Sequence, residues 1–291
     1  MPETGSHAGE AAPRSRAPRA GLSRGRISAV LLDVLGTLLE LEPPAPRLRE
    51  ALEREHGISV RLDDVERGFA AEIAHYRTHH LDGRDGAALA ELRTRCAREL
   101  RRGIDSRALD VLDDAELRAA MLDALRFRPY PDAAPALAQI HELGIRAVAV
   151  SNWDVALPDA LRAAGLDRAL DGVISSATVG RAKPDPVIFE RALAVAGASA
   201  TEAVHVGDSV REDVRGALDA GLGAVLLSRG EKPTAPRWQP ASAERGAGPS
   251  VERADEAGGS ALPAGVPVVR SLSELGPLLR ASSTADPAQL R

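Results

Sequence analysis

Acidic, hydroxyl and amine side chains recur directly after short apolar runs of this sequence. Asp33, Ser151 and Asp208 each stand at or just after the end of such a run, and Lys183 lies in a turn reading Lys-Pro-Asp-Pro. Two carboxylates brought together repel each other unless a cation lies between them, and oxygen ligands favour Mg²⁺. One carboxylate oxygen can bind the metal while the other acts as a nucleophile. These residue types indicate a metal-assisted hydrolytic site.

Strands that alternate with helices must bring these residues together. The apolar runs are short and rich in Val, Leu, Ile and Ala, as in buried parallel strands, and helical patterns separate them. Such alternation predicts a Rossmann-like doubly wound parallel sheet, in which ligands bind at the carboxyl ends of the strands. We expect strands at 27–32, 146–150, 172–174, 203–206 and 224–227, and helices at 133–143, 187–196 and 210–220.

Residues 43–126 have a different character from the rest of the chain. Leu, Ala and Val recur there at helical spacing among many Arg and Glu residues, with few strand formers. This pattern predicts an inserted all-helical cap domain between two parts of the core, 27–42 and 127–228. Its helices are expected at 45–55, 62–77, 87–102 and 116–125.

Two ends and one internal stretch lack a periodic apolar face. Residues 1–26 are predicted to be a disordered tail, residues 282–291 a C-terminal tail, and the Pro/Gly/Ala-rich segment 229–264 a flexible connection. Residues 265–281 are expected to return to the core as a last strand and helix. Pro267 places that strand at a sheet edge, because proline cannot donate to a central ladder.

Composition excludes several classes of protein. A net charge of −5 gives no signature of nucleic-acid binding, and no apolar run is long enough to cross a bilayer. The single cysteine, Cys96, cannot form an internal disulfide and is expected to be a buried thiol. We therefore expect a cytoplasmic protein without nucleic-acid or membrane partners, either a monomer or a homodimer.

The order of the reactive residues resembles the four motifs of the haloacid dehalogenase-like (HAD) superfamily over most of residues 27–228. The segments "KPDPVIF" and "GDSVREDVRGALDAGL" carry most of this resemblance, because they are long. The helical insertion between the first two motifs is also similar to the cap domain of that family, which closes over the substrate.

The resemblance implies a role for each residue. Asp33 would be the nucleophile, and Lys183 would stabilise the charge that develops during the reaction. A small phosphorylated metabolite would be the substrate, and an aspartyl-phosphate the intermediate. The phosphoryl group would be bound by Thr37, Ser151, Asn152 and Lys183, and Mg²⁺ by Asp33, the Leu35 carbonyl, Asp208 and Asp213.

One position departs from the pattern of the phosphatases in this family. They carry a second aspartate two residues after the nucleophile, which protonates the leaving group, and here that position is Leu35. Such a proton donor typically raises the reaction rate by about 100-fold to 10,000-fold. A Mg²⁺-dependent phosphatase favouring good leaving groups is our first interpretation. A 2-haloacid dehalogenase, whose halide needs no proton, and a catalytically weak or inactive binding protein are the alternatives.

Some residues carry weaker signals. Asp33 taken alone would more often be a helix cap than a nucleophile, so its interpretation depends on the other motifs. Four residues cluster in the expected cap: His75, Tyr76, His79 and His80. A charged helix end explains this cluster more simply than a role in binding a metal or the substrate.

Overall fold

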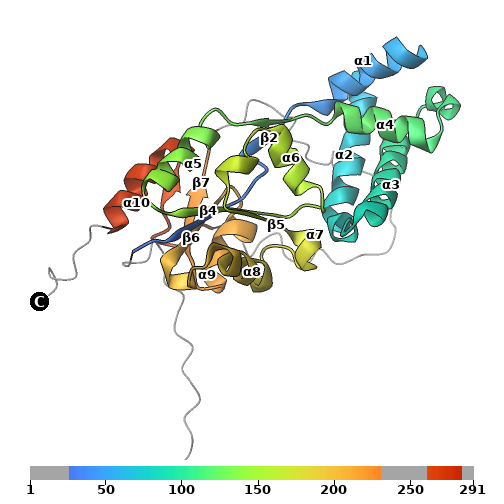
Figure 1. The fold of residues 1–291 in the computed structure, drawn as a ribbon. Helices are drawn as coiled ribbons and strands as arrows, with labels where there is room; N and C mark the ends of the chain where they lie inside the picture. Colours follow the sequence, from blue (N-terminus) through green and yellow to red (C-terminus); the bar gives the residue numbers. More distant parts are fainter. Residues whose placement is uncertain (1–25, 231–260, 284–291) are drawn as a thin grey trace, which may run out of the picture.

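A six-stranded parallel sheet forms the centre of the computed structural model, which describes residues 26–230 and 261–283 (Figure 1). The strand order is β5-β4-β1-β6-β7-β8. The strands are β1 (Ala29–Leu32), β4 (Arg146–Ser151), β5 (Gly172–Ser175), β6 (Ala203–Gly207), β7 (Gly223–Leu227) and β8 (Val268–Val269). Strand β1 is central, so the residues after β1, β4 and β6 meet at one edge.

Helices cover both faces of this sheet, as the predicted doubly wound fold requires. Alternate residues of a strand point to opposite faces. Val30 and Leu32 pack with α5 (Ala133–Glu142), α6 (Leu157–Ala163) and α10 (Leu275–Ser283). Ala29 and Leu31 pack instead with α8 (Pro186–Ala196) and α9 (Gly216–Asp219). The predicted fold class is confirmed.

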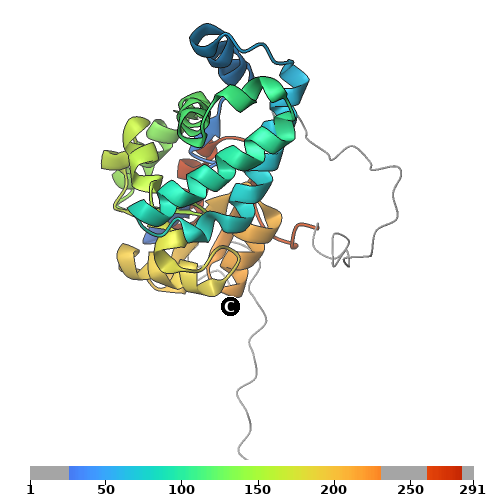
Figure 2. The same cartoon turned by 90° about the vertical axis from the view of Figure 1, so that its right-hand side faces the viewer.

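Four helices form the inserted region, with their own apolar core. They are α1 (Pro44–His56), α2 (Leu62–His79), α3 (Gly86–Ile104) and α4 (Asp114–Ala124). Local signals set their ends: Gly57 adopts a left-handed conformation after α1, Asp85 caps α3, and Asp113 forms a capping box at α4. Figure 2 shows α2 and α3, in cyan and teal, lying side by side.

A two-stranded antiparallel ribbon joins the core to the helical region. It pairs β2 (Leu39–Leu41) with β3 (Phe127–Pro129). The sequence analysis did not predict this ribbon, because three-residue strands are too short to show a period. The ribbon brings both crossings of the chain between core and cap to one place.

Most predicted elements differ from the observed ones only at their ends, but a few differ in kind. The predicted helix 210–220 is a π-helix, η5 (Val210–Arg215), followed by the short α9. Helices α6 and α7 (Ser176–Val179) were not predicted, nor were the short 3₁₀ turns η1 (His80–Asp82), η2 (Arg107–Val111), η3 (Asp167–Ala169), η4 (Ala200–Glu202) and η6 (Leu272–Glu274).

The last strand lies at the sheet edge, as the proline at position 267 predicted. Strand β8 is at the sheet edge and begins directly after that proline. Most of the predicted tails and of the segment 229–264 lies outside the described residues. No helix in the described ranges is long and apolar enough to span a membrane.

Candidate active site

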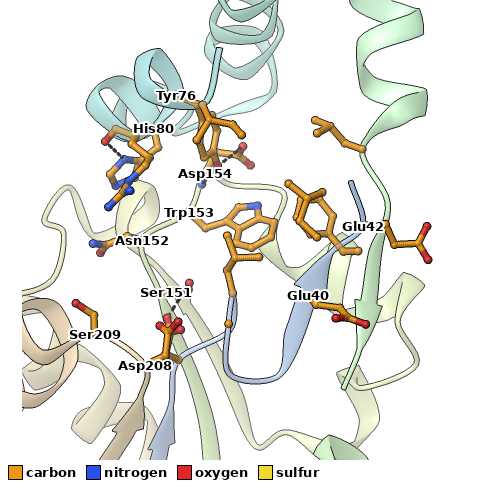
Figure 3. A pocket seen from close by; sticks show the side chains of 18 of the residues that line it. Glu40, Glu42, Tyr76, His80, Ser151, Asn152, Trp153, Asp154, Asp208 and Ser209 are labelled. Atoms are coloured by element: carbon orange, nitrogen blue, oxygen red, sulfur yellow. Dashed lines mark hydrogen bonds between the residues drawn. The ribbon is translucent and has the colours of Figure 1, made fainter. Parts of the chain in front are cut away.

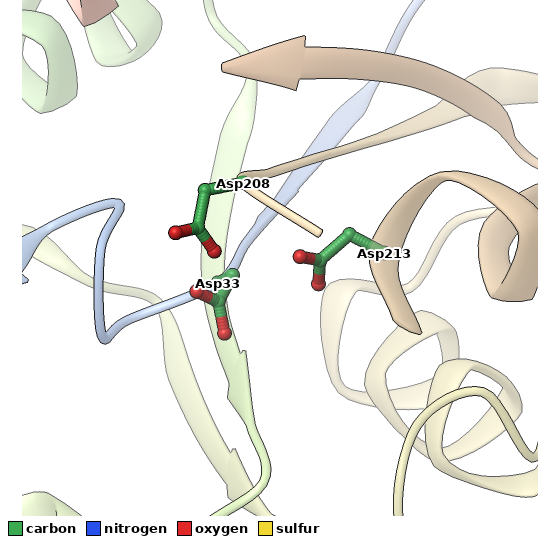
Figure 4. Close-up of side chains that lie close together, drawn as sticks. All are labelled: Asp33, Asp208 and Asp213. Atoms are coloured by element: carbon green, nitrogen blue, oxygen red, sulfur yellow. The ribbon is translucent and has the colours of Figure 1, made fainter. Parts of the chain in front are cut away.

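Three aspartates converge at the carboxyl edge of the sheet (Figure 4). Asp33 follows β1, Asp208 follows β6, and Asp213 lies in η5. One oxygen of each carboxylate lies within 4.8 Å of those of the other two. Asp33 and Asp213 are buried. Three carboxylates so close together form the kind of oxygen site that Mg²⁺ prefers.

Lys183 supplies the positive charge of this cluster. Its Nζ atom lies 2.7 Å from Asp33 Oδ1 and 2.6 Å from Asp213 Oδ1, and the residue is only 4% exposed. Removing either carboxylate would leave this buried ammonium partly uncompensated, which is costly. The predicted lysine and aspartates are therefore one interacting unit.

The charges in this unit alter one another's protonation. Burial raises the pKa of Asp33, and Lys183 offsets only part of that effect. Burial opposes ionisation of Asp213 as well, but Lys183 and His205 outweigh it and hold the pKa of Asp213 below its usual range. Burial would lower the pKa of Lys183, yet Asp213 and Asp33 together keep that pKa above its ordinary value. Lys183 therefore stays an ammonium at neutral pH.

Asn152 lines the cavity, yet its side chain holds the Lys183 loop in place. Its Oδ1 accepts a hydrogen bond from the backbone N–H of Lys183 at 2.7 Å, and its Nδ2 donates to the Lys183 carbonyl at 3.0 Å. Nδ2 also lies 3.3 Å from Glu212 Oε2. In this arrangement Asn152 positions Lys183, a use that the sequence analysis did not predict.

The two predicted hydroxyl groups have different environments. Ser151 Oγ donates to Asp33 Oδ1 at 3.3 Å, so it lies beside the predicted nucleophile. Thr37 is fully buried and is not part of the cavity wall, and its hydroxyl has no hydrogen-bond partner among the described residues. Its role in phosphate binding stays a prediction.

Gly36 allows the chain after Asp33 to pass close to Asp208. It adopts a φ of +90°, and a Cβ atom there would lie 2.3 Å from Asp208 Oδ2. Glycine is the residue that accepts both this backbone conformation and this contact. The turn that follows the nucleophile therefore sets the distance between two of the three carboxylates.

A cavity of about 1280 Å³ opens above the carboxylates, between core and cap. Figure 3 shows Asp208 and Ser151 on one side of it, Tyr76 and Asp154 on the other, and Trp153 between them. Leu35 also lines this cavity and is 44% exposed. The position at which the resemblance leads us to expect an acid thus presents an apolar side chain to the cavity.

Arg229 fixes the loop that follows β1. Its guanidinium forms two hydrogen bonds of 2.9 Å with Asp132, donates to the Thr37 carbonyl at 2.8 Å, and stacks 3.8 Å above the ring of Tyr130. The sequence analysis assigned Arg229 to the flexible segment 229–264. In the structure this first residue of the segment belongs to the core and lines the cavity.

The cap histidines do not form a metal-binding cluster with other residues that the structure describes. Among residues 26–230 and 261–283, the group whose geometry suits a metal ion is that of the three aspartates. His75 and His79 stack on each other, and His80 Nδ1 lies 2.9 Å from the Arg77 carbonyl. Tyr76 has a different role, because its hydroxyl donates to Asp154 Oδ2 at 2.9 Å and joins cap to core.

Sequence reasoning also missed His205, Glu72 and Arg93. His205 lies inside β6 and its Nε2 contacts Asp213 Oδ1 at 2.9 Å, while Glu72 and Arg93 line the cavity from the cap. A histidine within an apolar strand was a usable signal, since buried histidines need partners. Glu72 and Arg93 gave none, because the cap helices carry many charged residues.

Comparison with known proteins identifies relatives that match most of the chain. A model of the haloacid dehalogenase-like hydrolases matches residues 27–221. "Phosphoserine phosphatase" of Thermus thermophilus is 31% identical over 72% of this chain and 92% of its own length. A Mycobacterium tuberculosis protein named as a phosphatase is 30% identical over 70% of this chain and 88% of its own.

Solved structures share the fold. L-2-haloacid dehalogenase from Xanthobacter autotrophicus, with chloropropionic acid covalently bound, superposes with a TM-score of 0.58 at 23% identity. The match covers 87% of this chain and 98% of the other. At this identity the likeness concerns the fold, including the inserted helical region.

Proposed function

The chain belongs to the haloacid dehalogenase-like hydrolases, and on that basis we propose that it is a Mg²⁺-dependent phosphatase acting on a small phosphorylated metabolite. The observation that carries this proposal is the cluster of Asp33, Asp208 and Asp213, two of which, Asp33 and Asp213, pair with Lys183. Two relatives named as phosphatases, at 30% and 31% identity, support the same reaction class.

The donor set fits a magnesium ion. Asp33 and Asp208 present carboxylate oxygens close together, and no hydrogen bond to the Leu35 carbonyl oxygen occurs within the described residues. Asp213 adds negative charge, although its oxygens also accept hydrogen bonds from Lys183, His205 and the Ser209 N–H. When bound, Mg²⁺ would neutralise charge on the phosphoryl oxygens.

Asp33 would then act as the nucleophile. Its carboxylate oxygen forms a bond to phosphorus while the bond from phosphorus to the ester oxygen breaks, and the departing alkoxide takes a proton from solvent. Water hydrolyses the resulting acyl phosphate, which returns Asp33 and releases inorganic phosphate. Lys183 and Ser151, both in contact with Asp33, are placed to stabilise the phosphoryl oxygens.

The test is phosphate release from p-nitrophenyl phosphate and acyl phosphates, with and without Mg²⁺. We expect Mg²⁺-dependent turnover that the Asp33→Asn substitution reduces to the background rate. Asp219→Asn, an exposed aspartate on α9, is the matched control and should retain the activity. Turnover that survives Asp33→Asn after rigorous purification would contradict the proposal.

Leu35 favours one other candidate function, hydrolysis of a 2-haloacid, because a leaving halide needs no proton. Asp208 argues against it, since in the resemblance noted above that residue follows the metal-binding pattern rather than that of the metal-free dehalogenases. Halide release from 2-chloropropionate without Mg²⁺, in the absence of phosphate release, would replace the first proposal by this one.

A further inference from the structure

Glu72 is a buried carboxyl group on the cap side of the cavity. It lies on α2, is 5% exposed, and belongs to the cavity wall. Burial raises the pKa of Glu72 to about 7, and the neighbouring Cys96 thiol lowers it only in part. Within the described ranges, no Lys, Arg or His forms an ion pair with it. A carboxylate in this position lacks the positive partner that buried charges require.

Arg93 faces the same cavity from the adjacent helix. It lies on α3 one turn before Cys96, so the two share a helix face, and Cys96 is the residue beside Glu72. Arg93 is half-buried and forms no hydrogen bond or ion pair with any other residue that the structure describes. Its neighbours on α3 do have partners: Arg95 pairs with Asp82 and Arg98 with Asp114.

The cap therefore presents the Glu72 carboxyl group and the Arg93 guanidinium to the substrate cavity, and neither forms an ion pair with another described residue. The hydrogen bond between Glu72 and the Cys96 thiol supplies no charge. Cys96 contributes no compensating charge, because burial raises the pKa of its thiol and keeps it protonated. The α4 residues on this wall, Met121 and Leu122, and Leu125 just after that helix are apolar. A ligand with an ammonium and a carboxylate group would supply both missing partners at once.

We propose that Glu72 and Arg93 bind the ammonium and carboxylate groups of a zwitterionic phosphomonoester, the class to which O-phosphoamino acids belong. This inference rests on the proposed function, because it assumes that the phosphoryl group lies at Asp33. The cap residues select the alcohol part of the substrate, and the core residues act on the phosphoryl group.

The experiment compares kcat/KM for four phosphomonoesters with Mg²⁺. O-phospho-L-serine carries both charged groups, phosphoethanolamine the ammonium only, phosphoglycolate the carboxylate only, and glycerol 1-phosphate neither. We expect O-phospho-L-serine to be preferred by roughly 10-fold to 100-fold for each charged contact. Similar values for all four would overturn the proposal.

Two substitutions assign the contacts. Glu72→Gln should lower the ratio of kcat/KM for O-phospho-L-serine to that for phosphoglycolate, because these esters differ in the ammonium group. Arg93→Gln should lower the ratio of O-phospho-L-serine to phosphoethanolamine, which differ in the carboxylate. Glu91→Gln, an exposed glutamate on α3, should alter neither ratio. Ratios that stay unchanged in the first two variants would overturn the assignment.

Failure of the proposed function remains distinguishable. If p-nitrophenyl phosphate is not hydrolysed, the phosphatase proposal fails, and calorimetric titration of O-phospho-L-serine into the protein then tests the cap site directly. Weaker binding by Glu72→Gln and Arg93→Gln than by Glu91→Gln would support it. Equal binding by all three variants would overturn it.

Discussion

Leu35 is the residue at which this sequence departs from the phosphatase pattern of the resemblance described above. Its exposed side chain lines the cavity next to the carboxylate cluster, where the shorter side chain of an aspartate would fit. Without a proton donor, the rate should depend strongly on how well the alcohol departs as an anion. We therefore expect p-nitrophenyl phosphate to be hydrolysed faster than alkyl esters.

Leu35→Asp should restore a proton donor. We expect the kcat for an alkyl ester such as glycerol 1-phosphate to rise by about 100-fold or more relative to that for p-nitrophenyl phosphate. Steady-state kinetics on both esters measures this ratio. Leu35→Asn, which has a similar shape but cannot donate the same proton, is the control. An equal gain in both variants would show that size, rather than acidity, limits the enzyme.

Glu72 should make stability depend on pH. Its pKa rises from 4.5 to about 7 on folding, so the folded protein takes up a proton between these pH values. The free energy of unfolding should therefore fall as the pH rises through this interval, by about 3 kcal/mol in total. Urea denaturation at pH 5 and pH 8 measures the change.

The Glu72→Gln variant should show little of this fall in the free energy of unfolding with rising pH, because glutamine does not titrate. The variant Glu91→Gln, at an exposed position, should show the same fall as the parent protein. The same loss of stability between pH 5 and pH 8 in both variants would show that the proton uptake belongs to another group.

Among the elements, the turn between β1 and β2 controls the geometry of the carboxylates. Gly36→Ala would place a methyl group 2.3 Å from Asp208 Oδ2 in a backbone conformation with a φ of +90°. We expect Asp208 to move and Mg²⁺ binding, measured by calorimetry, to weaken. Gly57→Ala is the control, since Gly57 also has a positive φ, but a methyl group there would meet no described residue within 4 Å apart from its neighbours in the chain.

Both alanine variants should lose about 1–2 kcal/mol of stability through backbone strain. Only Gly36→Ala should lose Mg²⁺ affinity. Equal Mg²⁺ affinity in the two variants would mean that the turn does not position Asp208.

At the scale of the whole molecule, hydrogen bonds join the cap to the core beside the cavity. The Tyr76 hydroxyl donates to Asp154, and the Val155 N–H donates to the Gly83 carbonyl at 2.9 Å. Tyr76→Phe removes the first of these bonds, worth about 1 kcal/mol. We expect the Val155 amide to exchange with solvent about 5-fold faster, as measured by hydrogen exchange.

Tyr130→Phe is the control for this experiment. It removes the hydroxyl of the other tyrosine in the chain, which does not take part in the contact between Tyr76 and Asp154. It should leave exchange at Val155 as in the parent protein. Unchanged exchange in Tyr76→Phe would show that this hydrogen bond does not limit opening of the cap.

The alternation of strands and helices in the core, and the meeting of Asp33, Ser151 and Asp208, followed from the sequence by itself. Apolar runs and helical periodicity report local structure, and parallel strands bring their carboxyl ends to one edge. Long motifs such as "KPDPVIF" added the family. These features depend on neighbouring residues in the chain.

Only the tertiary structure decided which charged residues face the cavity and which contact each other across it. The Asn152 side chain contacts the Lys183 backbone, which its spacing in the sequence did not indicate, and its predicted role in binding substrate stays a prediction. Arg229 was assigned to a flexible segment, yet it pairs with Asp132. Glu72 and Arg93 looked like any other charged residues of a solvated helix. Spacing along one helix shows which residues share a face, whereas the partner of that face depends on how helices far apart in the sequence pack together.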